Sequence, residues 1–172
     1  MALALSISAE QYEQLLGHLG ASGDEQAAFL FTAPPSAVEP LRVVEVHAVP
    51  RAETLEPSPF YLALSDEVRA RVIARASSLG GCLVEAHNHP YGPAAFSATD
   101  LAGFEEWVPH VRWRLAGRPY VALVLAAAEF DALVWRDADG VPEGLDRLDV
   151  AGEPLAPTGL TQRRLARKSR VG

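Results

Sequence analysis

The chain reads His87-Asn88-His89-Pro90-Tyr91-Gly92-Pro93-Ala94-Ala95-Phe96-Ser97-Ala98-Thr99-Asp100 directly after an apolar run that is typical of a β-strand. Side chains of a strand alternate between its two faces, so His87 and His89 are expected on one face. Asp100 adds a carboxylate from the first turn of a helix predicted at Ser97–Trp107. Three N and O donors leave the fourth position of a tetrahedral zinc free for water. The stretch therefore predicts a metal centre that carries out hydrolysis.

The spacing His-x-His-x7-Ser-x2-Asp, from His87 to Asp100, resembles the signature of the JAB/MPN (JAMM) metalloproteases. The members of this family are zinc enzymes that cleave peptide or isopeptide bonds after ubiquitin-like proteins. The resemblance covers most of residues 8–136 and is strongest in the motif itself. It implies a fold of the α/β (α+β) class, in which helices flank a mixed, cytidine-deaminase-like β-sheet in a single domain.

The resemblance also implies a role for each polar residue of the motif. His87, His89 and Asp100 would bind one Zn²⁺ per chain. Ser97 would stabilise the oxyanion that forms during hydrolysis. The pattern Ser-x-x-Asp at the start of a helix is also a variant of the capping box, and the two interpretations are compatible because a capped first turn would aim Asp100 at the metal.

Three glutamates on or beside predicted strands are candidates for the general base: Glu25, Glu45 and Glu85. Glu85 has the same strand parity as His87, so it is expected on the same face. Glu25 is followed by a small residue and a leucine at the offsets found in the family's catalytic segment. We therefore favour Glu25 as the base, and Glu85 and Glu45 remain alternatives.

Two positions depart from the family pattern. Asn88 stands where Ser or Thr is common, and Ala28 stands where Gly is usual. On strand parity Asn88 points away from the metal, so neither change removes a ligand. The form His-Asn-His-Pro also occurs in the RadC-type branch of the superfamily, which keeps a RadC-like, DNA-associated protein as an alternative function.

Hydrophobic periodicity places the other elements around the motif. An almost purely apolar run at Tyr120–Ala127 predicts a central strand, and residues 131–136 predict a hairpin or edge strand. Pro109 is expected to close the helix that carries Asp100. The pattern further predicts helices at 8–19 and 65–79, strands at 24–32, 41–49 and 82–87, a loop at Pro50–Pro59 and an extended piece at Phe60–Leu62.

The C-terminal part of the chain differs in composition from the rest. Beyond Asp137 the sequence is rich in Gly and Pro and is expected to be irregular. Residues 162–172 contain four Arg and one Lys without any acidic residue, which predicts a solvated tail. We therefore divide the chain into a metalloprotease domain at residues 1–150 and a C-terminal extension at residues 151–172.

Composition excludes several classes of protein. The chain has 172 residues, a net charge of -7 and a pI near 5.2, which argues against a nucleic-acid-binding protein because phosphate binding needs a basic face. Neither a membrane span nor a signal peptide is recognisable, so a cytoplasmic location without membrane contact is expected. The single cysteine, Cys82, has the opposite strand parity to His87, which argues against a cysteine protease.

The resemblance implies the partners as well as the chemistry. Bacterial relatives act on ubiquitin-like proteins, together with activating and conjugating enzymes, in conjugation systems that include antiphage defence. We expect this chain to process the precursor or to reverse the conjugate. A peptidase of sulfur-carrier proteins in the same superfamily is an alternative with the same chemistry. A non-catalytic scaffold would lack ligands that are present here, and a zinc deaminase would need a Pro-Cys-x-x-Cys sequence that is absent.

Overall fold

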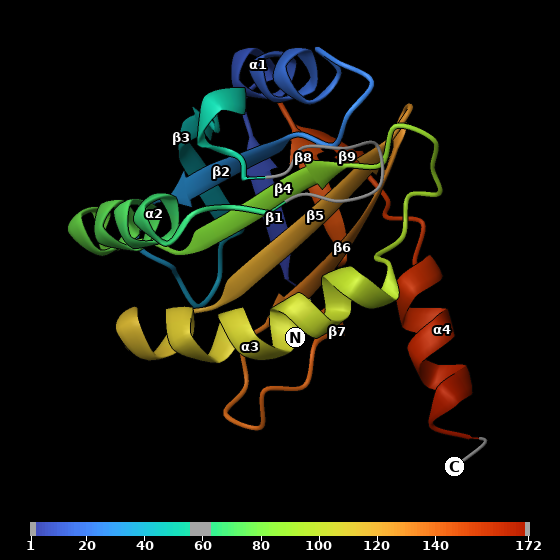
Figure 1. The fold of residues 1–172 in the computed structure, drawn as a ribbon. Coiled ribbons are helices and arrows are strands. Elements are labelled where there is room, and N and C mark those ends of the chain that lie inside the picture. Colours follow the sequence, from blue (N-terminus) through green and yellow to red (C-terminus); the bar gives the residue numbers. More distant parts are fainter. Residues whose placement is uncertain (1–2, 56–62, 171–172) are drawn as a thin grey trace.

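The computed structural model describes residues 3–55 and 63–170. Within these ranges the strands form one mixed sheet in the order β7-β6-β5-β4-β2-β3-β1-β8-β9 (Figure 1). The elements follow one another as β1 (Ala4–Ile7), α1 (Ala9–Leu19), β2 (Ala27–Thr32), β3 (Leu41–Ala48), the 3₁₀ turn η1 (Arg51–Glu53), α2 (Asp66–Leu79), β4 (Leu83–Asn88), α3 (Ala98–Arg114), β5 (Tyr120–Ala126), β6 (Glu129–Trp135), β7 (Glu143–Gly144), β8 (Arg147–Val150), β9 (Glu153–Leu155) and α4 (Leu160–Lys168).

Helices cover both faces of the sheet, as the sequence predicts. Helix α1 buries Leu15 and Leu19 against one face, while α2 and α3 pack against the other, in front of the sheet in Figure 1. Strand β5 lies between β4 and β6, and its side chains alternate between the two cores. A strand that is buried on both faces needs apolar residues at every position, which explains the run at Tyr120–Ala126.

Side-chain caps fix the helix starts that the sequence predicts. Ser8 and Gln11 form a reciprocal capping box at the start of α1. Ser65 accepts a hydrogen bond from the Val68 N–H at the start of α2. The apolar stripe of α2, which consists of Val68, Val72, Ile73 and Ala76, is buried against the sheet. Helix α2 therefore packs against the same face of the sheet as α3.

Strand β4 carries the first histidine of the motif and lies in the interior of the sheet, between β2 and β5. It pairs antiparallel with β2 and parallel with β5, so that His87 is aligned with Ala27 on one side and with Val124 on the other. Residues aligned across strands share a face of the sheet. The first histidine is thus held between two fully paired strands, beneath the layer that α2 and α3 form.

Helix α3 continues through Pro109 to Arg114, so the prediction that Pro109 closes it is wrong. Pro109 is exposed, whereas Phe104, Val108 and Val111 on the inner side of the same helix are buried. A proline in a helix interior costs about 3 kcal/mol, while each buried apolar side chain contributes about 1.5–3 kcal/mol. The apolar stripe on both sides of Pro109 therefore keeps the helix intact.

The C-terminal part is more regular than the sequence predicts. Strand β8 pairs parallel with β1 and antiparallel with β9, and the boundary that we place after residue 150 falls between β8 and β9. Residues 160–168 form helix α4 instead of an irregular tail, although its basic side chains are exposed. Strand β8 depends on pairing with the distant strand β1, and β9 depends on β8 in turn, which local periodicity does not reveal.

Other predictions concern the segment between β3 and α2. The predicted loop at Pro50–Pro59 contains the short turn η1, but residues 56–62, including the extended piece at Phe60–Leu62, lie outside the described residues.

In the ranges that the structure does describe, each helix falls short of a bilayer span in its length or in its apolar character.

Candidate metal centre

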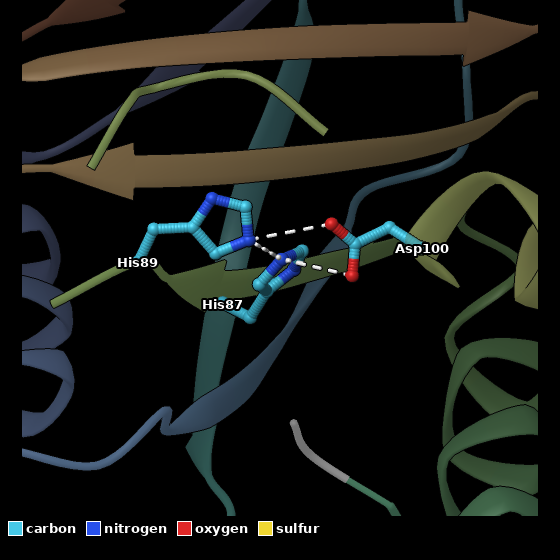
Figure 2. A group of neighbouring side chains, drawn as sticks. All are labelled: His87, His89 and Asp100. Carbon is cyan, nitrogen blue, oxygen red and sulfur yellow. Dashed lines mark hydrogen bonds and ion pairs between the residues drawn. The ribbon is translucent and has the colours of Figure 1, made fainter. Parts of the chain in front are cut away.

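Two elements bring together the three predicted metal ligands. His87 is on β4, His89 follows its last residue, and Asp100 is in the first turn of α3. His87 Nε2 lies 3.2 Å from His89 Nε2 and 3.5 Å from Asp100 Oδ1, and His89 Nε2 lies 3.3 Å from Asp100 Oδ2. Figure 2 shows the two imidazoles and the carboxylate pointing toward one another. The sequence prediction that these side chains converge is confirmed.

The donor set and its spacing fit a tetrahedral zinc ion. Zinc binds histidine nitrogen and carboxylate oxygen at about 2.0–2.1 Å, so two of its tetrahedral ligands lie roughly 3.3–3.4 Å apart. The separations of 3.2–3.5 Å between the three side chains match this value. The second ring nitrogen of His89, Nδ1, lies 3.1 Å from the Pro93 carbonyl oxygen. This bond orients the ring with Nε2 toward the ion, as outer hydrogen bonds do in zinc sites.

A capping box fixes the third ligand. The Ser97 N–H donates to Asp100 Oδ2 at 2.7 Å, and the Asp100 N–H donates to Ser97 Oγ at 3.1 Å. The two bonds hold the Asp100 carboxylate on the side of α3 that faces the histidines. Because the Ser97 hydroxyl accepts in this box, its proton is not consumed by the cap and is left for a second partner.

The Asp100 carboxylate and the histidines are electrostatically coupled. Burial alone would raise the pKa of Asp100, but hydrogen bonds and charge from His87 and His89, together with the Ser97 N–H, hold that pKa well below its ordinary value. Burial alone would lower the pKa of His89, but the Asp100 carboxylate, the Pro93 carbonyl and the Glu25 charge raise it overall. The site therefore favours a carboxylate and attracts positive charge.

The Glu25 carboxylate lies beside the three ligands. Its Oε1 is 3.7 Å from His89 Nε2, and the side chain is 7% exposed. Glu25 precedes the first residue of β2, and the next residue, Gln26, donates its N–H to Asn88 Oδ1 at 2.6 Å. Burial, together with the Asp100 charge, raises the pKa of Glu25 against the lowering effect of the histidines. The structure thus places a carboxylate with a raised pKa next to the metal ligands.

The other two candidate bases are engaged elsewhere. Glu85 faces the same side of β4 as His87, as predicted, but it accepts a hydrogen bond from the Tyr120 hydroxyl at 2.5 Å. Of the two glutamates Glu25 and Glu85, Glu25 and not Glu85 has a carboxylate oxygen within 4 Å of a ring nitrogen of the motif histidines. Glu45 forms an exposed ion pair with Arg75 on α2. The structure therefore places the carboxylate of Glu25, and not those of Glu85 and Glu45, next to the metal ligands.

A family model that describes the prokaryotic homologues of the JAB domain matches residues 8–137, which is most of the chain. The chain belongs to this family. The match includes the three convergent side chains, Glu25 and Ser97. The resemblance stated from the motif, and the α+β fold that it implies, are confirmed for this JAB-domain protein.

Comparison with solved structures agrees on the fold. The solution structure of protein DSY2949 from Desulfitobacterium hafniense matches this JAB-domain protein with a TM-score of 0.55 and 19% sequence identity. The match covers 86% of this chain and 92% of that chain. At this identity the likeness concerns the fold alone. No curated protein matches the sequence.

A groove opens next to the metal ligands of the JAB domain. It has a volume of about 360 Å³ and runs between the start of α2 and the first turns of α3, with Glu25 and Asp100 at the end nearest the histidines. Its α3 wall combines the small residues Thr99, Ala102 and Gly103 with larger ones that include Phe104 and Trp107. A Cβ added at Gly103 would meet nothing within 4 Å, so this wall leaves space for a ligand.

Sequence reasoning missed two residues that position the site. Asn88 was expected only to point away from the metal, yet its amide oxygen fixes the backbone next to Glu25. Tyr120 was assigned to a core strand, yet its hydroxyl holds Glu85 and accepts a hydrogen bond from Trp107 Nε1 at 2.9 Å. Both contacts join residues that are distant in the sequence, and an amide in the middle of His-x-His is the one local signal for them.

Proposed function

We propose that this JAB-domain protein is a zinc-dependent peptidase or isopeptidase of the JAMM type. The observation that carries the proposal is the arrangement of His87, His89 and Asp100 with the Glu25 carboxylate 3.7 Å from His89 Nε2. A closed structural zinc site would have a fourth protein ligand in place of a nearby base. Three donors with an adjacent carboxylate are the arrangement expected for hydrolysis.

The chemistry divides among the four side chains. When bound by the two histidines and Asp100, zinc would lower the pKa of a coordinated water and polarise the carbonyl of the substrate. Glu25 would accept the proton of the attacking water and return it to the leaving amine, for which its raised pKa suits it. The Ser97 hydroxyl would donate a hydrogen bond to the oxyanion.

We propose a ubiquitin-like protein as the substrate, cut after its C-terminus. The groove beside Glu25 and Asp100 is where we place the substrate's C-terminal segment, and the small residues Thr99, Ala102 and Gly103 line part of it. We propose the predicted loop at Pro50–Pro59 as a rim of this groove, although residues 56–59 lie outside the described residues. Ala63 and Leu64, which follow the undescribed stretch, line the groove. We propose that the cleavage serves precursor processing or deconjugation, alongside activating and conjugating enzymes, in a cytoplasmic bacterial system such as antiphage defence.

A DNA-associated role of the RadC type has less support. The groove is lined by four carboxylates, those of Glu25, Glu85, Asp100 and Glu106, with Arg69 as its basic residue. A nucleic-acid backbone would be repelled from this surface, since binding of phosphates requires basic groups. A sulfur-carrier protein as substrate would involve the same chemistry and is distinguished by the cleavage test.

The test is cleavage of defined fusions. Bacterial ubiquitin-like modifiers and sulfur-carrier proteins, each fused at the C-terminus to a reporter protein, are incubated with the zinc-loaded chain, and the products are identified by mass spectrometry. The proposal expects a single cut directly after the C-terminal residue of a ubiquitin-like modifier and no cut with a chelator. Cleavage of the sulfur carriers alone would assign the alternative substrate. Absence of any cut across the panel would count against the proposed function.

A further inference from the structure

The segment that follows β9 touches the loop between the two parts of the metal motif. The Phe96 N–H donates to Thr161 Oγ1 at 2.9 Å, and the Thr158 hydroxyl donates to the Ala94 carbonyl oxygen at 2.7 Å. Ala94, Ala95 and Phe96 are each no more than 2% exposed. Buried backbone groups need partners, and here the partners come from the C-terminal segment. Figure 1 shows the start of α4 beside this loop.

This segment is anchored in turn by a buried carboxylate. Asp131 on β6 is 1% exposed, and it accepts hydrogen bonds from the Thr161 N–H at 2.8 Å and the Gly159 N–H at 3.1 Å. Its Oδ1 also lies 3.1 Å from the Ala132 nitrogen. No ion pair reaches Asp131 within the described residues, so backbone N–H groups satisfy it. We call Asp131, Thr158 and Thr161 the C-terminal clamp.

Asp131 of the C-terminal clamp lies on the same face of the sheet as the metal ligand His87. His87 is aligned with Val124, and Val124 with Asp131, so all three side chains share one face. The Phe96 ring packs against the imidazole of His87 with ring centroids 5.8 Å apart. Phe96 directly precedes Ser97, whose capping box holds Asp100. The hydrogen bond from the Phe96 N–H to Thr161 thus holds the loop between β4, which carries His87, and α3, which carries Asp100.

We propose that the C-terminal clamp positions the metal centre, with Thr161 as the positioning residue for Phe96 and, through it, for His87 and Asp100. Thr158 and Thr161 lie beyond residue 137, where the family match ends, whereas their anchor Asp131 lies within the match. Sequence reasoning assigned this region to the extension beyond the catalytic domain. The inference rests on the metal site of the proposed function, but it does not depend on which bond the protein cuts.

Thr161→Val tests the clamp because valine has the shape of threonine but lacks the oxygen that Phe96 needs. The readouts are Co²⁺ affinity, measured by competition with a chelator, and the visible d–d absorption of the Co²⁺-loaded chain. We expect Thr161→Val to weaken Co²⁺ binding about tenfold, the lower end of the effects of outer-shell substitutions, and to change the d–d bands. Thr161→Ser, which keeps the oxygen, is expected to restore both readouts.

The control is Gln162→Ala on the same helix, because Gln162 donates to the Pro142 carbonyl oxygen away from the motif loop. It is expected to bind Co²⁺ as the wild type does. A folded Thr161→Val chain with the wild-type affinity and spectrum would overturn the inference. If Thr161→Val does not fold, Thr158→Val replaces it with the same criteria.

Failure of the proposed function can be told apart from failure of the clamp. A wild-type chain that binds Co²⁺ but cuts no fusion rejects the proposed peptidase activity, while the comparison of Thr161→Val with Thr161→Ser still decides the role of the clamp. A wild-type chain that binds no Co²⁺ overturns both.

Discussion

Oε1 of Glu25 lies 3.7 Å from Nε2 of His89, although Glu25 precedes β2 and His89 follows β4. The antiparallel pairing of β2 with β4, which aligns Ala27 with His87, brings the two residues together. The hydrogen bond from the Gln26 N–H to Asn88 Oδ1 then holds the backbone next to Glu25 beside the end of β4. A carboxylate in this place can take a proton from water at the metal, which makes it the central element of the proposed mechanism.

Glu25→Gln is expected to retain zinc and lose cleavage. Removal of a general base typically costs about 10²–10⁴-fold in rate, while the ligands of the metal are untouched. Rates on a cleavable fusion and the zinc content of the purified variant provide the measurement. Glu45→Gln is the control, since Glu45 pairs with Arg75 on the surface, and it should keep the wild-type rate. An active Glu25→Gln enzyme would transfer the role to Glu85.

Substitutions of Ser97 separate its cap from its proposed catalytic role. At an N-cap, alanine costs about 1 kcal/mol of stability but glycine only a few tenths. If the hydroxyl also stabilises the oxyanion, Ser97→Ala and Ser97→Gly should lose rate equally, by about 10²–10³-fold, despite their different stabilities. Ser97→Thr should retain both properties. A rate that follows the stability of the variants would assign Ser97 to the cap alone.

Stability should depend on pH with opposite signs in the absence and presence of zinc. The raised pKa of His89 stabilises the metal-free fold below the ordinary histidine value of about 6.5, and this contribution is lost as pH rises through the raised pKa. The lowered pKa of Asp100 adds stability above about 3.9, which is lost as pH falls. Zinc needs neutral imidazoles, so its stabilising effect should grow over the same rise in pH.

Thermal unfolding between about pH 5.5 and about pH 8, a range around the ordinary histidine pKa of about 6.5, checks this expectation. The midpoint of the metal-free chain should fall relative to a His89→Gln variant as pH rises, and the increment produced by zinc should increase. A zinc increment that is the same at both ends of the range would contradict proton competition at His89.

Cys82 is expected to be irrelevant to the activity. The thiol is fully buried in the core that packs under α1, whereas the metal ligands lie on the opposite face of the sheet. Burial raises the pKa of Cys82 to about 11, so the reactive thiolate is scarce at neutral pH. Cys82→Ala and treatment with a thiol-blocking reagent should leave the cleavage rate unchanged. Inhibition by the reagent that disappears in Cys82→Ala would contradict this.

The sequence predicts the part of the site that is local. His87, His89 and Asp100 lie in one strand–loop–helix segment, so strand parity and a helix cap suffice to bring them together. The sequence also predicts the buried residues of β5 and of the apolar stripe of α2, because burial there depends on the position of a side chain within one element. These local patterns account for the centre of the sheet and the ligands of the metal.

Long-range contacts account for what the sequence does not predict. The family resemblance favours Glu25, but its approach to the histidines depends on the pairing of β2 with β4, which no pattern within one element reveals. The position of α4 depends on hydrogen bonds to Asp131 and Phe96. Residues 160–168 carry little apolar surface, so their periodicity gives no reason to dock them. Pro109 misleads because burial on the other side of α3 outweighs its cost.

Zinc K-edge X-ray absorption of the purified chain tests the central claim most directly, combined with metal counting in the wild type and in Asp100→Ala. The account predicts one zinc per wild-type chain, with nitrogen and oxygen neighbours at about 2.0–2.1 Å, two of them imidazoles. It also predicts loss of the ion in Asp100→Ala. A chain that takes up no zinc, or zinc with a sulfur neighbour at about 2.3 Å, would contradict it.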